Sequence, residues 1–196
     1  MSFGSVIPVT GLNLGFPGNV SRLADDVIAS RPVLTTANAI PFGSAVVIIS
    51  NNAGTFGGGD SYESVADFIA GGGTMTAALF AGVAVRNVKT LLSYTSLGNN
   101  DDVAQIGQFA PGELAEVLER GSITVVCNVG TPVSQGAVYL RIAANASIPA
   151  GVVGGFEAAA DGANTIDLST VGVVWRTGAK DANNVAEITL KTRVTA

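Results

Sequence analysis

The sequence predicts a mainly β protein: a compact antiparallel β-barrel or β-sandwich with one short helix and an extended N-terminal arm. Its 196 residues include 25 glycines and 7 prolines, which divide the chain into short segments. Turn residues placed about every 8–12 residues between β-branched runs are typical of all-β sandwiches and barrels. A chain of this length can form one domain with a sizeable core. We therefore expect an arm and entry segment over 1–43 and a single β-rich body over 44–196.

The arm is predicted to be irregular. Turn-forming residues interrupt every candidate element in it: Pro8, Gly11, Gly15, Pro17, Gly18 and Pro32. Its apolar residues follow no helical or strand period, so the segment cannot bury a face of its own. We expect it to lie along the body or along a neighbouring molecule. A partly disordered terminus is the alternative.

The first half of the body should hold a strand, a short helix and a second strand. Residues 45–49 form a continuous apolar run, typical of a strand buried on both faces. A helix is predicted over 61–70, where Asp60 or Ser61 can cap the first turn. Its apolar residues have helical spacing: Val65, Phe68 and Ile69. Residues 74–92 should return to strand.

The second half of the body contains one ambiguous segment and several clear strands. In 114–120, Leu114, Val117 and Leu118 would share a helical face, but the flanking glycines also permit a strand. Strands are predicted over 122–127, 137–142 and 171–176. The last strand alternates most clearly, and we expect it to be antiparallel with one solvent-exposed face. Its inner residues should be Ala186, Ile188, Leu190 and Val194, and its outer residues Glu187, Thr189, Lys191 and Arg193.

Charge and hydropathy argue against several classes of function. The formal charge of -5 argues against a nucleic-acid-binding protein, which would carry a basic stripe. The longest uninterrupted apolar run, 77–85, is far shorter than the about 20 residues of a membrane-spanning helix. Only 13% of the residues are charged, against about 25% in average soluble proteins. We expect partners to cover such a surface; a monomer rich in surface Ser, Thr and Asn is the alternative.

Residues that could carry catalysis or bind metals are scarce. The chain has 0 histidines, which removes the usual general base near neutral pH and every histidine-containing zinc site. Cys127 is the single cysteine and is expected to be a small buried hydrophobe. The pairs Asp25–Asp26 and Asp101–Asp102 could serve acid/base catalysis or hold a hard cation. For Asp101 and Asp102, an Asx-rich solvated turn is the simpler interpretation. We therefore expect no catalytic, cofactor-binding or metal-binding residues and no enzymatic activity.

Five segments carry a resemblance to a known family: 15–22 (GFPGNVSR), 40–46 (IPFGSAV), 80–86 (FAGVAVR), 111–125 (PGELAEVLERGSITV) and 133–139 (VSQGAVY). In this order along the chain, they resemble bacteriophage structural cement, or capsid decoration, proteins. The matches run in order over most of the chain, and the Gly/Ala-rich stretch 151–164 has no counterpart in the family.

The resemblance implies a non-enzymatic structural protein of the virion. Such a protein would bind the outer surface of an expanded phage head, between capsomers, and stabilise it against the pressure of packaged DNA. Its partners would be further copies of itself, in a homotrimer, and the major capsid protein. Since the N-terminus has no export signal, it would be made in the bacterial host cytoplasm. The resemblance also favours a strand over a helix at 114–120.

Candidate capsid-contact residues lie in the arm, because apolar side chains on a segment without a period need an external surface. These residues are Phe3, Leu14, Phe16, Val20 and Arg22. The same reasoning predicts that deletion of residues 1–22 leaves a folded body and abolishes binding to the capsid lattice.

Two other functions stay open. The chain could be another virion structural β protein, such as a tail or minor capsid component. It could also be a carbohydrate-binding module, which would use Tyr94, Asp101, Asp102 and Trp175. A soluble glycan would raise the melting temperature of such a module.

Overall fold

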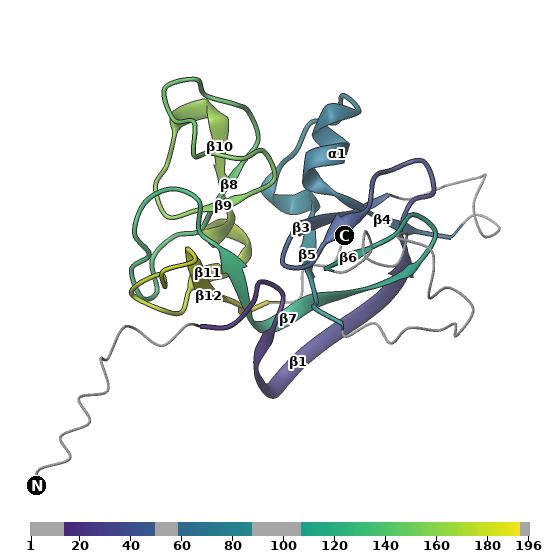
Figure 1. Cartoon of the computed structure of the whole chain (residues 1–196), viewed down its shortest axis with the longest axis horizontal. Coiled ribbons are helices and arrows are strands. Elements are labelled where there is room, and N and C mark those ends of the chain that lie inside the picture. Colours follow the sequence, from purple (N-terminus) through teal and green to yellow (C-terminus); the bar gives the residue numbers. More distant parts are fainter. Residues whose placement is uncertain (1–13, 50–58, 88–106, 193–196) are drawn as a thin grey trace, which may run out of the picture.

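The computed structural model describes residues 14–49, 59–87 and 107–192, without the side chains of residues 23 and 24. Figure 1 shows antiparallel strands with one short α-helix, which confirms the predicted mainly β class. The sheets are not closed into a barrel, because the strand order of the largest sheet ends at β4 and β11, which do not pair with each other. The arrangement is consistent with a β-sandwich. The division into an arm and a body stays a prediction.

The elements are short apart from two strands of 13 residues. In chain order the strands are β1 (Val20–Pro32), β2 (Ile40–Pro41), β3 (Ala45–Ile49), β4 (Ser61–Ser64), β5 (Phe80–Ala84), β6 (Gln108–Phe109), β7 (Leu114–Val126), β8 (Tyr139–Arg141), β9 (Phe156–Glu157), β10 (Thr165–Asp167), β11 (Val173–Trp175) and β12 (Val185–Leu190). The α-helix is α1 (Val65–Ala70), and the 3-10 helices are η1 (Ala77–Leu79), η2 (Gly162–Asn164) and η3 (Leu168–Val171). No helix in these described ranges is long and apolar enough to cross a membrane.

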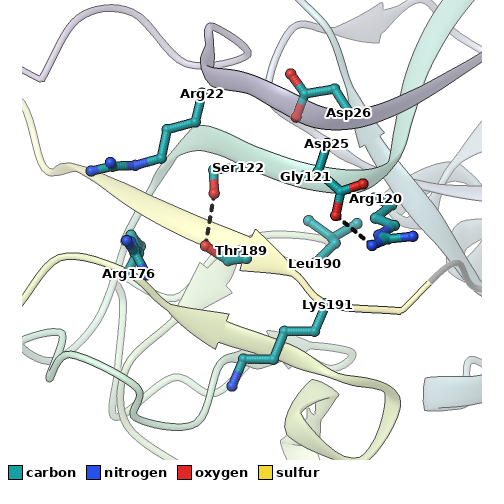
Figure 2. A pocket seen from close by; sticks show the side chains of 10 residues that line it. All are labelled: Arg22, Asp25, Asp26, Arg120, Gly121, Ser122, Arg176, Thr189, Leu190 and Lys191. Carbon is teal, nitrogen blue, oxygen red and sulfur yellow. Dashed lines mark hydrogen bonds and ion pairs between the residues drawn. The ribbon is translucent and has the colours of Figure 1, made fainter.

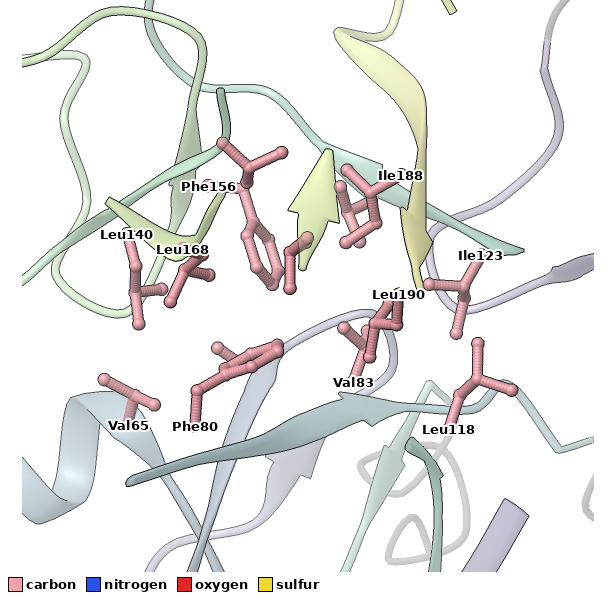
Figure 3. Packing of buried hydrophobic residues seen from close by; sticks show 14 of the residues in the cluster. Val65, Phe80, Val83, Leu118, Ile123, Leu140, Phe156, Leu168, Ile188 and Leu190 are labelled. Atoms are coloured by element: carbon pink, nitrogen blue, oxygen red, sulfur yellow. The ribbon is translucent and has the colours of Figure 1, made fainter. Parts of the chain in front are cut away.

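β7 is the central strand of the largest sheet, whose order is β11-β12-β7-β5-β3-β4. β1 pairs with most of β7, from Pro32 beside Leu114 to Val20 beside Ile123. β5 and β12 pair with successive parts of β7, at 117–118 and 121–126. Because a strand has only two edges, β5 and β12 must share the edge opposite β1. The sheet therefore forks at β7, and its two branches face each other across the core (Figure 3).

The expectation that residues 1–43 are irregular is wrong for β1. The register of β1 against β7 shifts at three places within Val20–Ile28. These shifts and the polar residues between them hide the two-residue period that identifies a strand in a sequence. Pairing with β7 therefore decides the local structure, since strand formation depends on the neighbouring strand more than on intrinsic preference.

Buried side chains form two clusters, one on each face of the sheet. Neighbouring residues of a strand point to opposite faces, and on β7 Val117 belongs to the smaller cluster and Leu118 to the larger. Cys127 is buried in the larger cluster, as predicted. Figure 3 labels these members of the larger cluster: Val65, Phe80, Val83, Leu118, Ile123, Leu140, Phe156, Leu168, Ile188 and Leu190. The smaller cluster contains Val33, Ile40, Val46, Tyr62, Ala81, Ala84, Phe109, Ala115 and Val117.

Most of the other predicted strands are confirmed. The segments 45–49 and 122–127 lie in β3 and at the end of β7, and 114–120 is a strand that forms the first part of β7. The strands β8 and β11 are shorter than predicted: β8 lies within the predicted segment 137–142, and β11 lies within 171–176. Within 74–92 only β5 is a strand, η1 precedes it, and residues beyond 87 lie outside the described part of the chain.

The helix begins later than predicted. β4 occupies the first four residues of 61–70 and pairs with β3, so α1 holds only the last six. Ser64 caps the helix, and its Oγ accepts a hydrogen bond from the Asp67 N–H at 3.1 Å. Tyr62 is fully buried in the smaller cluster. Burial of this ring and pairing with β3 therefore take precedence over a longer helix.

The expectation of one solvent-exposed face on the last strand is wrong at Glu187. This residue lies on the outer face of β12 but is only 6% exposed. The start of β1 covers it, since Ser21 Oγ donates a hydrogen bond to Glu187 Oε1 at 2.7 Å. Of the other predicted outer residues, Thr189 is half-buried and Lys191 is exposed. Arg193, and the predicted inner residue Val194, lie outside the described ranges.

Candidate functional site

The predicted contact residues take different roles in the structure. Leu14 and Phe16 are exposed, at 36% and 62%. Val20 packs against the larger core cluster of its own chain, and Arg22 lines a pocket described below. Phe3 lies outside the described residues. Leu14 and Phe16 are thus open to a partner, and the role of all five in capsid contact stays a prediction.

Backbone hydrogen bonds around Gly18 fix the segment before β1 to the body. The Gly18 N–H donates to the Thr124 carbonyl at 2.7 Å, and the Gly18 carbonyl accepts from the Arg86 N–H at 2.7 Å. Gly18 has a φ of +84°, and a Cβ there would lie 2.9 Å from the Arg86 nitrogen, so a larger residue does not fit. The Arg86 guanidinium carbon lies 4.2 Å from the centre of the Phe16 ring. The exposed ring is therefore held on a fixed backbone by a cation–π contact.

A pocket of about 360 Å³ opens between the start of β1, the middle of β7 and the end of β12 (Figure 2). It is lined by Arg22, Asp25, Asp26, Arg120, Gly121, Ser122, Arg176, Thr189, Leu190 and Lys191. We name this site the cationic pocket, because four of its residues are basic in a chain that has only 10 basic residues and a net charge of -5. The rest of the chain is consequently more acidic than the whole.

Two cations of the pocket are paired within the protein. Arg22 Nε lies 3.1 Å from Glu187 Oε1. Arg120 forms an ion pair with Asp25 across the β1–β7 pair, shown as a dashed line in Figure 2. Both arginine side chains remain substantially exposed, at 59% and 43%. The Arg120–Asp25 pair is exposed on both sides, and such pairs contribute about 0–1 kcal/mol to stability. In the other pair the Glu187 side chain is buried, at 8% exposure.

The other two cations have no carboxylate partner within the described residues. Arg176 is exposed, and its side chain forms no hydrogen bond or ion pair there. Lys191 Nζ donates to the neutral Gln135 Oε1 at 3.0 Å. In Figure 2 both side chains lie across the β12 ribbon from the two aspartates. The pocket therefore presents uncompensated positive charge on this side.

Asp26 is the least favourably placed group of the pocket. Both carboxylate oxygens are buried and lack a well-formed hydrogen bond within the described residues. The carboxylate lies against Gly121, where a Cβ would come within 2.1 Å of Asp26 Oδ1. Burial raises the pKa of Asp26 above its usual value; the backbone of Ser122 offsets part of this effect, and the charge of Asp25 adds to it.

Replacing Asp26 with asparagine should raise the melting temperature at neutral pH. A carboxyl group with a raised pKa binds its proton more tightly in the folded than in the unfolded chain, so its ionisation lowers stability as the pH rises above about 4. The advantage of D26N should therefore shrink as the pH falls toward 4. Thermal melts of D26N and the wild type between pH 4 and 8 measure the difference. The control D25N, which loses the ion pair with Arg120, should gain nothing, and a D26N protein no more stable at pH 7 would contradict this account.

Sequence reasoning identified one basic residue of the cationic pocket, Arg22, but not the pocket itself. Its other cations, at 120, 176 and 191, are distant in the sequence, and pairing of β1, β7 and β12 brings them together. The alternation of the last strand predicted that Lys191 lies on an outer face. This was the one sequence signal for a basic residue of the cationic pocket other than Arg22. Nothing local marks Arg120 or Arg176.

The described residues give no support to metal or sugar chemistry. They contain no group of three or more His, Cys, Asp or Glu side chains placed to hold a metal ion. Trp175 is 1% exposed, so its ring is not available for stacking on a sugar. Tyr94, Asp101 and Asp102 lie outside the described ranges. The carbohydrate-binding interpretation thus loses Trp175 as a stacking platform.

Comparisons with known proteins identify the family. No curated protein matches the chain. A chain of the solved structure "The capsid of Myoviridae Phage XM1" has the same fold, with a TM-score of 0.58 and 16% identity over 98% of this chain and 99% of that chain. The family model described as structural cement protein (E217 gp24/Pam3 gp6) matches residues 7–191. Since this match spans nearly the whole sequence, the chain belongs to the structural cement protein family and is a cement, or decoration, protein of the phage capsid.

Proposed function

We propose that the protein is a non-enzymatic homotrimer that binds the major capsid protein between capsomers, on the outer surface of an expanded head. The observation that carries this proposal is the match of residues 7–191 to the structural cement family. The low charged fraction of 13% supports it, because large permanent interfaces resemble protein cores more than ordinary surfaces do.

Stabilisation of the shell would follow from binding alone. A ligand that binds the assembled lattice and not its free subunits shifts the equilibrium toward the lattice. At a free concentration of about 100 times Kd, the gain is about 2.7 kcal/mol for each site. Across the many equivalent sites of a head, this small gain raises the temperature at which the shell opens. No chemical step is required.

The segment that carries Leu14 and Phe16 is the proposed shell contact, together with Phe3, Val20 and Arg22. Phe16 is 62% exposed and lies against Arg86, and aromatic and arginine side chains are enriched at the centres of interfaces. The fixed backbone at Gly18 reduces the entropy that this segment loses on binding.

Binding to heads tests the proposal. Expanded heads without the protein are mixed with increasing amounts of it, bound protein is measured by sedimentation, and the opening temperature is measured by calorimetry. We expect saturable binding and an opening temperature that rises with occupancy. No binding, or equal binding to unassembled capsid subunits, would contradict the proposed role.

Replacing Phe16 with alanine should weaken head binding by about 30-fold, the effect of losing an interface residue worth about 2 kcal/mol. The ring is largely exposed, so the melting temperature of the free protein should change little. Val133→Ala is the matched control, because Val133 is similarly exposed, at 67% against 62% for Phe16, but lies outside this segment. Equal affinities of the two variants would exclude Phe16 from the interface.

A further inference from the structure

Opposite charges lie on two separate parts of the large sheet. The strand order β11-β12-β7-β5-β3-β4 places the cationic pocket beside β12 and β7, and β4 at the far end. Glu63 on β4 and Asp67 on α1 lie at that far end. Burial and the neighbouring charge of Asp67 raise the pKa of Glu63, as expected for two carboxylates close together. Figure 1 shows α1 and β4 well separated from β12.

Neither acidic side chain is paired with a cation in the described part of the chain. Asp67 accepts hydrogen bonds from the Asn38 N–H and Nδ2, at 2.9 and 2.7 Å, which leave its charge in place. Among the described residues, the neighbouring cation Arg31 pairs instead with Asp60, at 2.9 Å. The far end of the sheet thus holds two uncompensated negative charges, as the pocket holds the two positive charges of Arg176 and Lys191.

Pairing of strands between copies is blocked at both ends of the sheet. The Leu34 N–H donates to the Tyr62 carbonyl of β4 at 2.9 Å. At the other end, Gln135 and Gly136 form hydrogen bonds with the carbonyl and N–H of Trp175 in β11, at 2.7 and 3.0 Å. Covered edges of this kind prevent sheets from joining edge to edge. Contacts between copies at these ends must therefore use side chains.

We propose that the cationic pocket of one copy receives Glu63 and Asp67 of the next copy, so that copies associate head to tail. The pocket and the acidic end are different surfaces of one chain, so the contact is heterologous and closes into a ring when the rotation between copies allows it. Only the number of copies in the ring, three, rests on the proposed function. Charges at the rim of such a contact make association faster and sensitive to salt.

Charge reversal at each end tests the contact. The variants are Arg176→Glu, Glu63→Lys and the double variant that carries both, and their masses are measured by light scattering over a range of concentrations. Lys180→Glu is the matched control, because Lys180 lies outside the pocket. Its ammonium donates to the Cys127 carbonyl at 3.3 Å and forms no ion pair within the described residues. Circular dichroism and thermal melts establish that each variant is folded.

We expect the wild type to form a multiple of its 19.6 kDa chain mass that dissociates as salt is raised. Each single reversal should weaken association by about tenfold or more, whereas the double variant and the control should resemble the wild type. In a mixture of R176E and E63K, opposite charges meet only at contacts between one variant and the other. A ring of three cannot alternate two kinds of copy, so the mixture should not form closed rings of three. A monomeric wild type, an unchanged mass for R176E, or no recovery in a folded double variant would overturn the proposal.

Head binding by the same proteins separates this proposal from the proposed function. If the wild type binds heads and the mass of R176E is unchanged, only the head-to-tail contact is wrong. If R176E loses head binding at unchanged mass, the pocket faces the shell and not another copy, which also overturns the contact. If the wild type associates as expected but does not bind heads, the head-to-tail contact stands and the cement role is wrong.

Discussion

Replacing Glu157 with glutamine should lower the free energy of unfolding by about 3–5 kcal/mol, the usual effect of breaking a buried ion pair. The side chains of Glu157 and Arg141 are both 0% exposed. The Arg141 guanidinium donates through Nε to Glu157 Oε1 and through Nη2 to Oε2, the latter at 2.9 Å. Glutamine keeps the shape of the side chain but removes its charge, which leaves the guanidinium buried with less compensation. Urea denaturation of E157Q and the wild type measures the change.

A second carboxylate completes this buried network. Arg141 Nη1 donates to Asp161 Oδ2 at 2.8 Å, and Asn145 Nδ2 donates to both Asp161 oxygens at 3.0 and 2.9 Å. The Asn145 bonds, and then Arg141, hold the pKa of Asp161 below its usual value. A carboxyl group with a lowered pKa adds stability above its unfolded pKa and loses it as the pH falls. Asp161 thus responds to acid in the opposite sense to Asp26.

Two comparisons make the E157Q result interpretable. Asp60→Asn breaks the Arg31–Asp60 pair, whose side chains are 31% and 43% exposed, and should change stability by less than about 1 kcal/mol. Replacing Arg141 and Glu157 together with methionine and leucine removes both charges and should recover much of the loss. An E157Q protein within about 1 kcal/mol of the wild type would show that the pair contributes no more than a surface pair.

Alanine at Gly82 should destabilise the fold by about 3 kcal/mol, because β5 passes β7 too closely for a side chain. Gly82 has a φ of +153°, and a Cβ there would lie 2.3 Å from the Leu118 carbonyl oxygen. The clash is with backbone, so relief requires β5 to move away from β7 and to weaken the pairing of Val83 with Leu118. Since this pairing joins one branch of the sheet to the central strand, the loss should affect the whole body.

The control for this substitution is Gly59→Ala. A Cβ at Gly59 meets nothing within 4 Å, and the residue lies just before β4. Denaturant unfolding should therefore show a near-wild-type midpoint for G59A and a much lower midpoint for G82A. Similar midpoints for the two variants would mean that β5 and β7 can separate at little cost.

The apolar pattern of the sequence correctly predicted those strands whose faces are regularly buried. The continuous apolar run at 45–49 and the alternation at 186–190 identified β3 and β12, because burial on known faces imposes those patterns. β1 was missed because its register shifts break the period. The helix was predicted to begin too early because Tyr62 lies in β4 and pairs with β3. The local sequence gives no sign of this pairing.

The candidate sites were harder to predict than the strands. Arg141 lies in a predicted strand, but the neighbouring sequence does not indicate that its side chain is buried. Nor does it indicate that Glu157 and Asp161 form ion pairs with it. The cationic pocket likewise depends on pairing between strands that are far apart in the sequence. Phe16 is exposed, whereas Val20, predicted to make the same kind of contact, packs against the core. The role of both residues in capsid contact stays a prediction.

The central position of β7 also sets the order in which the chain can fold during synthesis. β1 leaves the ribosome early, but its partner strand follows much later: Asp25 and Arg120, which form an ion pair across the two strands, are 95 residues apart. At synthesis rates of about 5–20 residues per second, β1 waits roughly 5–20 s for the strand that completes it. The polar residues of β1 should limit its association with other chains in that interval, since an apolar strand left unpaired recruits them. The polar residues that hide β1 in the sequence would thus also limit aggregation of the nascent chain until β7 emerges.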